Sequence, residues 1–185
     1  MCNLSVNQTP AGLPRVWRQL NAWMPEHQPR ALWPWLSHGG SLTEKLRATL
    51  GNAFRVEVLH EGIAQLDVEE TILLRTLPGT AARVREVYLC GTSPVVFART
   101  LASAQAANWL QDLNVQPLGD RIFADSDVRR SAIELTQLDP RQALYQAAVQ
   151  GISRPLKALW ARRSVLTVRD SHLLIYECFL GVPGR

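Results

Sequence analysis

The stretch that organises the chain is Arg83-Val84-Arg85-Glu86-Val87-Tyr88-Leu89-Cys90. Its residues alternate with a period of two, which predicts a β-strand. Arg85 falls on one face of that strand together with the aliphatic residues Val87 and Leu89. The next four residues, Gly-Thr-Ser-Pro, have turn chemistry, and residues 95–100 are the returning strand. The fold is therefore expected to contain a hairpin that carries an arginine on an apolar face.

The last predicted strand, residues 173–180, repeats this pattern with the opposite charge. Glu177 lies on one of its faces with Leu173, Ile175 and Phe179. A cation and an anion on apolar strand faces are costly unless a partner satisfies them. Either the two groups satisfy each other, or a ligand lies between them. From the alternation alone, a structural pair is the commoner case.

The composition is that of an ordinary globular protein. A length of 185 residues predicts one domain, 1–185, with residues 1–14 loose. The net charge is +4, but the arginines are scattered, so no nucleic-acid-binding surface is predicted. No signal peptide or membrane-spanning run occurs, which predicts a cytoplasmic protein without membrane insertion. We also expect a monomer.

Short turns and loops join most of the predicted strands, whereas a parallel sheet needs regular strand–helix alternation. We therefore expect an α+β fold: a single antiparallel β-sheet of five to seven strands flanked by helices. The helix at 42–50 has the clearest ends, because Ser41 begins a capping-box pattern and Gly51 follows the last turn. Further helices are expected at residues 15–24, 103–113, 121–124 and 139–150. Strands are expected at residues 54–60, within 63–77 on either side of a loop at 67–70, and at 83–90, 95–100, 127–138, 165–169 and 173–180, the last two as a hairpin.

The sequence lacks the usual signatures of nucleophilic, nucleotide-dependent and metal-dependent enzymes. It has no GxSxG, phosphate-binding loop, dinucleotide fingerprint or HExxH motif. The three cysteines and four histidines lack the spacing of a zinc site, so no metal site is predicted. Arg85 and Glu177 remain the candidate functional residues.

Seven short segments of the chain form an ordered set: Ser41–Thr43, Arg85–Cys90, Arg99-Thr100, Pro117–Gly119, Ile133-Glu134, Ala161–Ser164 and Glu177–Leu180. This set resembles the bacterial chorismate pyruvate-lyases over residues 35–181. No single segment is specific, but together they imply the family's fold, an antiparallel sheet that encloses a ligand under helical flaps. We expect the flaps at the helix after Ser41 and at residues 117–124. Extra residues between Leu135 and Trp160 distinguish the chain from shorter members and predict a helical insertion at 139–160.

The resemblance also implies a set of site residues. Arg85 would hold the ring carboxylate of chorismate, since a guanidinium matches a carboxylate with two parallel hydrogen bonds. The backbone N–H of Leu118 would donate to the same carboxylate, and Glu177 would lie near the ring hydroxyl. The main chain of Leu42 would border the site. Substrate-binding residues are thus Leu42, Arg85, Leu118 and Glu177, of which Arg85 and Glu177 are also catalytic.

The activity that the resemblance implies is carbon–oxygen cleavage by an oxo-acid lyase. Chorismate would give 4-hydroxybenzoate and pyruvate in the first committed step of ubiquinone biosynthesis. Aromatisation drives this reaction, so no cofactor, metal or covalent nucleophile is required. The alternative is a non-catalytic, small-carboxylate-binding domain, because ligand-sensing domains of GntR-type regulators resemble the same fold. Such domains normally accompany a winged helix, and residues before 41 leave no room for one, so we expect the enzyme.

Overall fold

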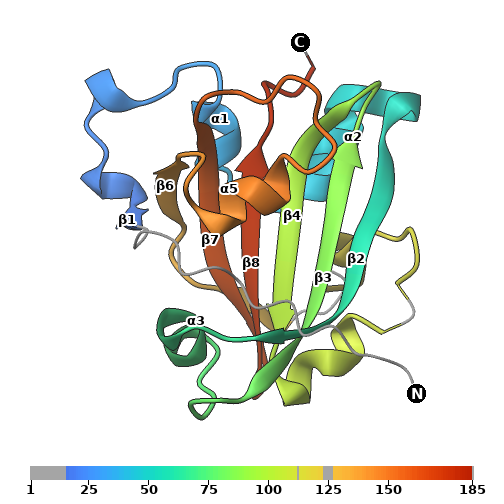
Figure 1. Cartoon of the computed structure of the whole chain (residues 1–185). Helices are drawn as coiled ribbons and strands as arrows, with labels where there is room; N and C mark the ends of the chain where they lie inside the picture. The colour runs from blue at the N-terminus through green and yellow to red at the C-terminus, as the bar shows by residue number, and fades with distance from the viewer. Residues whose placement is uncertain (1–15, 112, 123–126, 185) are drawn as a thin grey trace.

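The computed structural model describes residues 16–111, 113–122 and 127–184 (Figure 1). Within this part of the chain, eight strands form one antiparallel sheet in the order β1-β6-β7-β8-β4-β3-β2, and β5 pairs with β7. The strands are β1 (Arg18–Gln19), β2 (Arg55–Gln65), β3 (Ala81–Cys90), β4 (Pro94–Ala102), β5 (Val128–Arg130), β6 (Glu134–Leu138), β7 (Leu159–Val168) and β8 (Ser171–Phe179).

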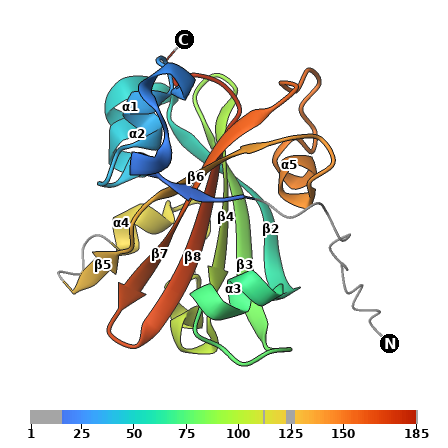
Figure 2. The ribbon, with the colours of Figure 1, turned by 90° about the vertical axis from the view of Figure 1, so that its left-hand side faces the viewer.

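Short helices cover both faces of the sheet, as expected for an α+β fold. Figure 2 shows α1, α2 and α4 on one face and α5 on the other. Buried apolar clusters lie under both sets of helices. The α-helices are α1 (Trp33–Leu36), α2 (Leu42–Leu50), α3 (Val68–Leu73), α4 (Leu118–Ile122) and α5 (Ala143–Ala148). The 3-10 helices are η1 (Leu20–Ala22), η2 (Pro25–His27), η3 (Gly51–Ala53) and η4 (Ala104–Trp109).

Both predicted hairpins are confirmed, and their registers decide which side chains face each other. In the β3–β4 hairpin Arg85 lies opposite Thr100. In the β7–β8 hairpin Val168 pairs with Ser171, so the turn is only two residues long. Its first residue, Arg169, has a φ of 53°, in the left-handed region that such tight turns use.

The predicted helix after Ser41 is confirmed as α2. The Ser41 hydroxyl accepts a hydrogen bond from the backbone N–H of Glu44 at 3.2 Å. Gly51 follows the helix with a φ of 55°, where a side chain would be strained. Leu42 and Leu46 are buried, so the apolar side of α2 packs on the sheet.

Three predictions of local structure are wrong. Residues 15–24 are not a helix, because the described part of this segment forms β1 and η1 and directs Trp17 and Trp23 onto the sheet. Residues 67–70 are not a loop: Asp67 and Glu70 form a reciprocal capping box that starts α3. Residues 127–138 form two strands, β5 and β6. The sheet therefore has eight strands instead of five to seven.

Other elements exist with different bounds. The helix expected at 103–113 is the 3-10 helix η4, and that expected at 139–150 is α5, which starts only after Gln142. The turn expected at 121–124 begins earlier, as α4, and its last two residues lie outside the described part, as do residues 1–14. Strand β2 continues past His60 after a bulge at Val58/His60. Among the helices in the described ranges, none is long and apolar enough to span a membrane.

Candidate active site

A cavity lies between the sheet and the helices α2 and α4. It has an empty volume of about 600 Å³, part of which is open to solvent. Strands β2, β3, β4, β7 and β8 supply the floor, and the first residues of α2 and residues 116–122 supply the roof. The lining residues are Ser41, Leu42, Thr43, Val56, Arg85, Val87, Leu89, Ala98, Thr100, Gln116, Pro117, Leu118, Gly119, Ile122, Arg130, Leu166, Ile175 and Glu177.

All four residues predicted for the site line this one cavity. Arg85 comes from β3 and Glu177 from β8, while Leu42 and Leu118 are the first residues of α2 and α4. The structure thus brings together positions that are as far as 135 residues apart in the sequence (177 − 42 = 135). Their roles toward a ligand remain predictions.

Arg85 is 3% exposed, and both terminal nitrogens of its guanidinium bond to the protein. Its Nη1 forms an ion pair with Glu61 of β2. Its Nη2 donates to the carbonyls of Asn114 and Gln116, at 3.3 Å for Gln116. Burial lowers the pKa of Arg85. Since a guanidinium has five N–H donors, these three bonds leave two of them for a ligand in the cavity.

Glu177 does not pair with Arg85. Its carboxylate accepts from Nε of Arg162, a neighbour on β7 that is only 1% exposed. The Nη1 of Arg162 donates to the carbonyls of Trp35 at 2.9 Å and His38 at 2.7 Å. Arg162 therefore fixes Glu177 and, at the same time, the chain segment that leads into α2.

Arg162 has a role that the sequence analysis did not assign, although it belongs to one of the segments that carry the resemblance. The feature of the sequence that could have revealed this role is the short turn between the last two strands. Counting outward from the pair Val168–Ser171 puts Arg162 directly opposite Glu177. In an antiparallel pair, opposed side chains lie on the same face of the sheet.

The two roof elements touch at the mouth of the cavity. A Cβ added at Gly119 would lie 3.0 Å from Oγ1 of Thr43 and 3.2 Å from Oγ of Ser41, so α4 approaches α2 very closely there. Outside this contact, Arg47 of α2 makes two hydrogen bonds to the carboxylate of Asp120 in α4, at 2.7 and 3.1 Å. These are the two segments that the sequence analysis predicted as flaps, and both lie over the cavity; their opening and closing stays a prediction.

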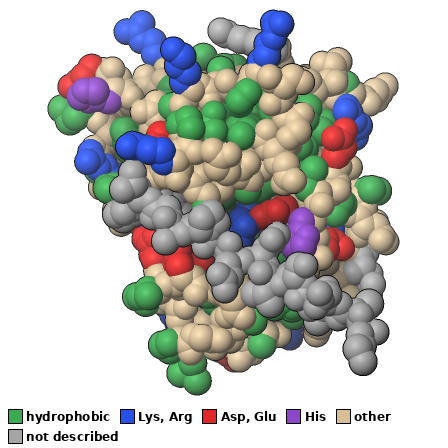
Figure 3. Space-filling model, viewed as in Figure 1, with side chains coloured by type: hydrophobic (Ala, Val, Ile, Leu, Met, Phe, Trp, Pro, Cys, Tyr) green, Lys and Arg blue, Asp and Glu red, His purple; other side chains and the backbone are tan. Residues whose placement is uncertain are grey.

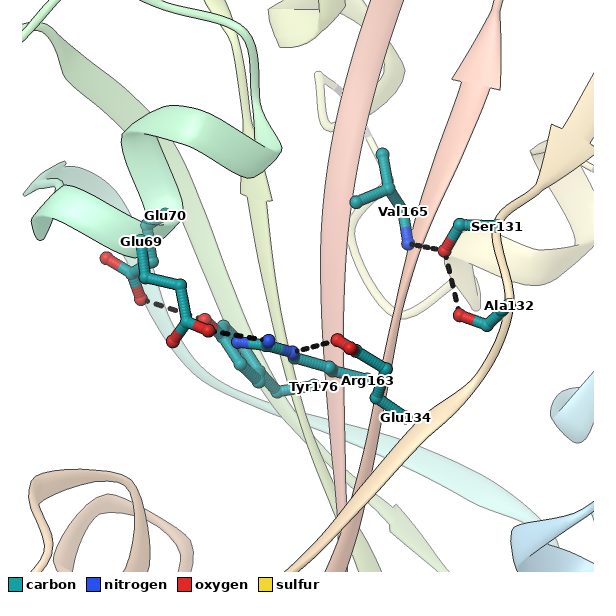
Figure 4. Close-up of polar contacts among 8 residues, drawn as sticks. All are labelled: Glu69, Glu70, Ser131, Ala132, Glu134, Arg163, Val165 and Tyr176. Carbon is teal, nitrogen blue, oxygen red and sulfur yellow. Dashed lines mark hydrogen bonds and ion pairs between the residues drawn. The ribbon is translucent and has the colours of Figure 1, made fainter. Parts of the chain in front are cut away.

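The face of the sheet away from the cavity carries its own charges. Arg163 bonds to Glu69 at 2.7 Å and to Glu134 at 2.8 Å, and Tyr176 donates to Glu70 at 3.2 Å (Figure 4). The guanidinium of Arg163 also lies 4.6 Å from the ring centroid of Trp17. On the outer surface of this side, charged side chains are spread out and form no single patch (Figure 3).

In the described part of the chain the cysteines and histidines are not arranged as a metal centre. Cys90 and Cys178 are buried, and burial raises the pKa of Cys90 to about 11. Cys2 lies outside the described residues. In residues 16–111, 113–122 and 127–184, no three His, Cys, Asp or Glu side chains gather as metal ligands would.

Comparison with known proteins gives a consistent family match. The sequence model of the chorismate lyase family matches residues 16–184. A probable chorismate pyruvate-lyase of Thiobacillus denitrificans is 36% identical over 165 residues, covering 85% of this chain and 88% of the relative. Another, of Aromatoleum aromaticum, is 38% identical over 159 residues, covering 82% and 85%.

Solved structures share the fold at low sequence identity. The effector domain of PhnF from Mycobacterium smegmatis matches with a TM-score of 0.55 and 18% identity over 77% of this chain and 89% of that domain. The ligand-binding domain of a putative GntR-family transcriptional regulator from Bordetella bronchiseptica matches with a TM-score of 0.54 and 14% identity, over 69% and 82%. At this identity the likeness concerns the fold alone.

Proposed function

We propose that this chain, which belongs to the chorismate lyase family, is a chorismate pyruvate-lyase that converts chorismate into 4-hydroxybenzoate and pyruvate. The observation that carries the proposal is the meeting of Leu42, Arg85, Leu118 and Glu177 in one cavity. A buried cation with free N–H donors suits the ring carboxylate, and apolar neighbours such as Val87 and Ile175 suit the ring itself.

The polar groups of the cavity suit the two ends of the substrate ring. Arg85 would bind the ring carboxylate, together with the N–H of Leu118, which has no acceptor within α4 because it belongs to the first turn. Glu177 would face the ring hydroxyl as an acceptor, held in place by Arg162. The main chain at Leu42 would close the site from above.

The reaction then needs only redistribution of bonds within the substrate. The bond between the ring carbon and the ether oxygen breaks, and the ring carbon that bears the hydroxyl loses its hydrogen as a proton. The methylene carbon of the enolpyruvyl group gains a proton, so that pyruvate leaves and the ring becomes aromatic. The protein contributes by selecting the reactive conformer and by preorganised electrostatics, so we propose no metal and no cofactor.

The biological setting follows from this activity and is also part of the proposal. The reaction would be the first committed step of ubiquinone biosynthesis, in the cytoplasm. We also propose that the protein acts as a monomer.

Incubation of purified protein with chorismate, followed by absorbance for 4-hydroxybenzoate, tests this function. Turnover should occur without added cofactor and should be unaffected by EDTA. Activity that EDTA abolishes and a divalent metal restores would contradict the cofactor-free mechanism. A folded protein that binds 4-hydroxybenzoate but does not turn over chorismate would instead support the carboxylate-binding alternative.

A further inference from the structure

We infer that Arg130 binds the second carboxylate of chorismate, the one on the enolpyruvyl group that leaves as pyruvate. The inference rests on the function proposed above. It starts from a second guanidinium that the cavity holds besides that of Arg85. Arg130 is the last residue of β5, lines the cavity, and donates from Nη1 to the hydroxyl of Ser164 at 2.5 Å.

The strand registers put the two arginines at opposite sides of the cavity floor. Arg85 lies opposite Thr100, Thr100 opposite Ile175, and Ile175 opposite Ser164, which is the residue that Arg130 contacts. This row crosses four neighbouring strands, about 14 Å of sheet at about 4.8 Å a step. Both arginines line the cavity, so a ligand that extends along this row would meet a guanidinium at each end.

Glu177 lies two residues along β8 from Ile175, on the strand next to β7. Because Arg130 donates to Ser164 of β7, its guanidinium is one strand from Glu177, whereas Arg85 of β3 is two strands from it. Its charge acts on Arg130: burial and the nearby Arg162 lower the pKa of Arg130, and Glu177 counteracts them. The carboxylate expected to face the ring hydroxyl is therefore close to the second cation.

Chorismate has its charges in a matching order. The ring carboxylate and the hydroxyl are on opposite carbons of the ring, and the enolpyruvyl ether is on the carbon next to the hydroxyl. With the ring carboxylate on Arg85 and the hydroxyl on Glu177, the enolpyruvyl carboxylate falls at the Glu177 side, where Arg130 is the cation that lines the cavity. Arg162 is not part of the lining and is occupied by Glu177, Trp35 and His38.

This assignment predicts that Arg130 affects the binding of the substrate and of the product differently. Chorismate has two carboxylates, whereas 4-hydroxybenzoate retains only the one assigned to Arg85. A contact to Arg130 would therefore strengthen substrate binding, hold the leaving group in one conformer, and add nothing to product binding. Arg85 should affect both ligands equally.

The experiment compares Arg130→Gln and Arg130→Lys with the matched control Arg129→Gln, an exposed neighbour on the same strand. For each protein we would measure kcat and KM for chorismate, the Kd of 4-hydroxybenzoate by calorimetry, and the melting temperature. Arg130→Gln should lower kcat/KM about 10- to 100-fold, as expected for a lost hydrogen bond between charged groups. The Kd of 4-hydroxybenzoate should change less than about threefold.

Arg130→Lys keeps the charge and should recover part of kcat/KM. It also tests the assignment if Arg130→Gln fails to fold. Equal losses of chorismate turnover and 4-hydroxybenzoate affinity would overturn the assignment, because they would indicate a role in shaping the whole cavity. Wild-type kcat/KM in Arg130→Gln would overturn it too. A wild-type protein that does not turn over chorismate would instead refute the proposed function. This outcome is distinguishable because the wild type is measured before any variant.

Discussion

The two faces of the sheet use charge in opposite ways. On the α5 face, charged side chains are paired with one another: Glu86 bonds to Arg99 at 2.6 Å, and Arg163 bonds to two carboxylates. On the α2 face, Arg85 and Arg130 border an empty volume. Both faces pair buried arginines with carboxylates, Arg85 with Glu61 and Arg162 with Glu177 on the second, but the second also has a cavity that arginines line.

Adjacent residues in the sequence are divided between these two uses. Arg85 faces the cavity, and Glu86 belongs to the ion pairs on the other side. In the same way Arg162 positions Glu177, and Arg163 joins β6 to α3. Each of these dipeptides therefore has one residue that serves the site and one that serves the sheet, which follows from the period of two in a strand.

The largest effect on the cavity face is expected for Arg85→Ala. Removing a buried charge-assisted contact should cost about 3–5 kcal/mol in kcat/KM and in 4-hydroxybenzoate affinity. Arg85→Lys should recover only part, since an ammonium cannot form the two parallel bonds. Steady-state kinetics and calorimetry would measure both. Near-wild-type product affinity in the alanine variant would make Arg85 a structural residue like those of the other face.

The matching change on the α5 face is Arg163→Met, which should destabilise the fold by about 1–2 kcal/mol, because it breaks two ion pairs whose carboxylates are partly exposed to solvent. The rate per folded molecule should stay within about twofold of wild type, since Arg163 points away from the cavity. Urea unfolding and turnover at low temperature would test this. Arg83→Met, at an exposed position of β3, is the control, and should change neither quantity.

Glu177→Gln lies between the two cases, because Glu177 lines the cavity and also pairs with Arg162. If the carboxylate acts on the ring hydroxyl, the single-turnover rate should fall about 10- to 100-fold, while binding of benzoate, which lacks the hydroxyl, changes little. The melting temperature must be measured with the rate. A large loss of stability with an unchanged rate would mean that Glu177 serves only to neutralise Arg162.

The smallest effect is expected at the exposed ion pair between the flaps. Asp120→Asn should weaken the contact to Arg47 by less than about 1 kcal/mol, and so accelerate product release up to about fivefold. A burst of product in pre-steady-state kinetics should accordingly become less pronounced. Asp139→Asn disrupts another exposed pair, with Arg141, far from the flaps in the sequence. A burst that responds equally to both changes would show that the Arg47–Asp120 pair does not hold the flaps together.

The elements that follow from local pattern could be predicted from the sequence. Alternation put Arg85 and Glu177 on apolar faces. The turn chemistry at residues 91–94 and the short link between the strands expected at 165–169 and 173–180 predicted the two hairpins. The family resemblance then supplied Leu42 and Leu118, which also line the cavity. Helix α2 was recognisable because both of its ends have capping residues.

The partners of the buried charges were less accessible, because they depend on the register between strands. The bulge at Val58/His60 reverses the alternation of β2 and turns Glu61 to the face of Arg85. Without that extra residue, Glu61 would be expected on the opposite face. Arg130 was missed for a similar reason: a three-residue strand gives no periodic signal.

The two-residue turn between β7 and β8 also limits where the length of this chain can change. A one-residue insertion at 169–170 that the turn did not absorb would shift the pairing by one position and turn β8 over. Tyr176 and Cys178 would then point into the cavity, and Glu177 would enter the opposite core. Loop grafts, tags or new chain ends are better placed in residues 151–158, which lie outside every strand and helix and can lengthen without moving either partner of the Arg162–Glu177 pair.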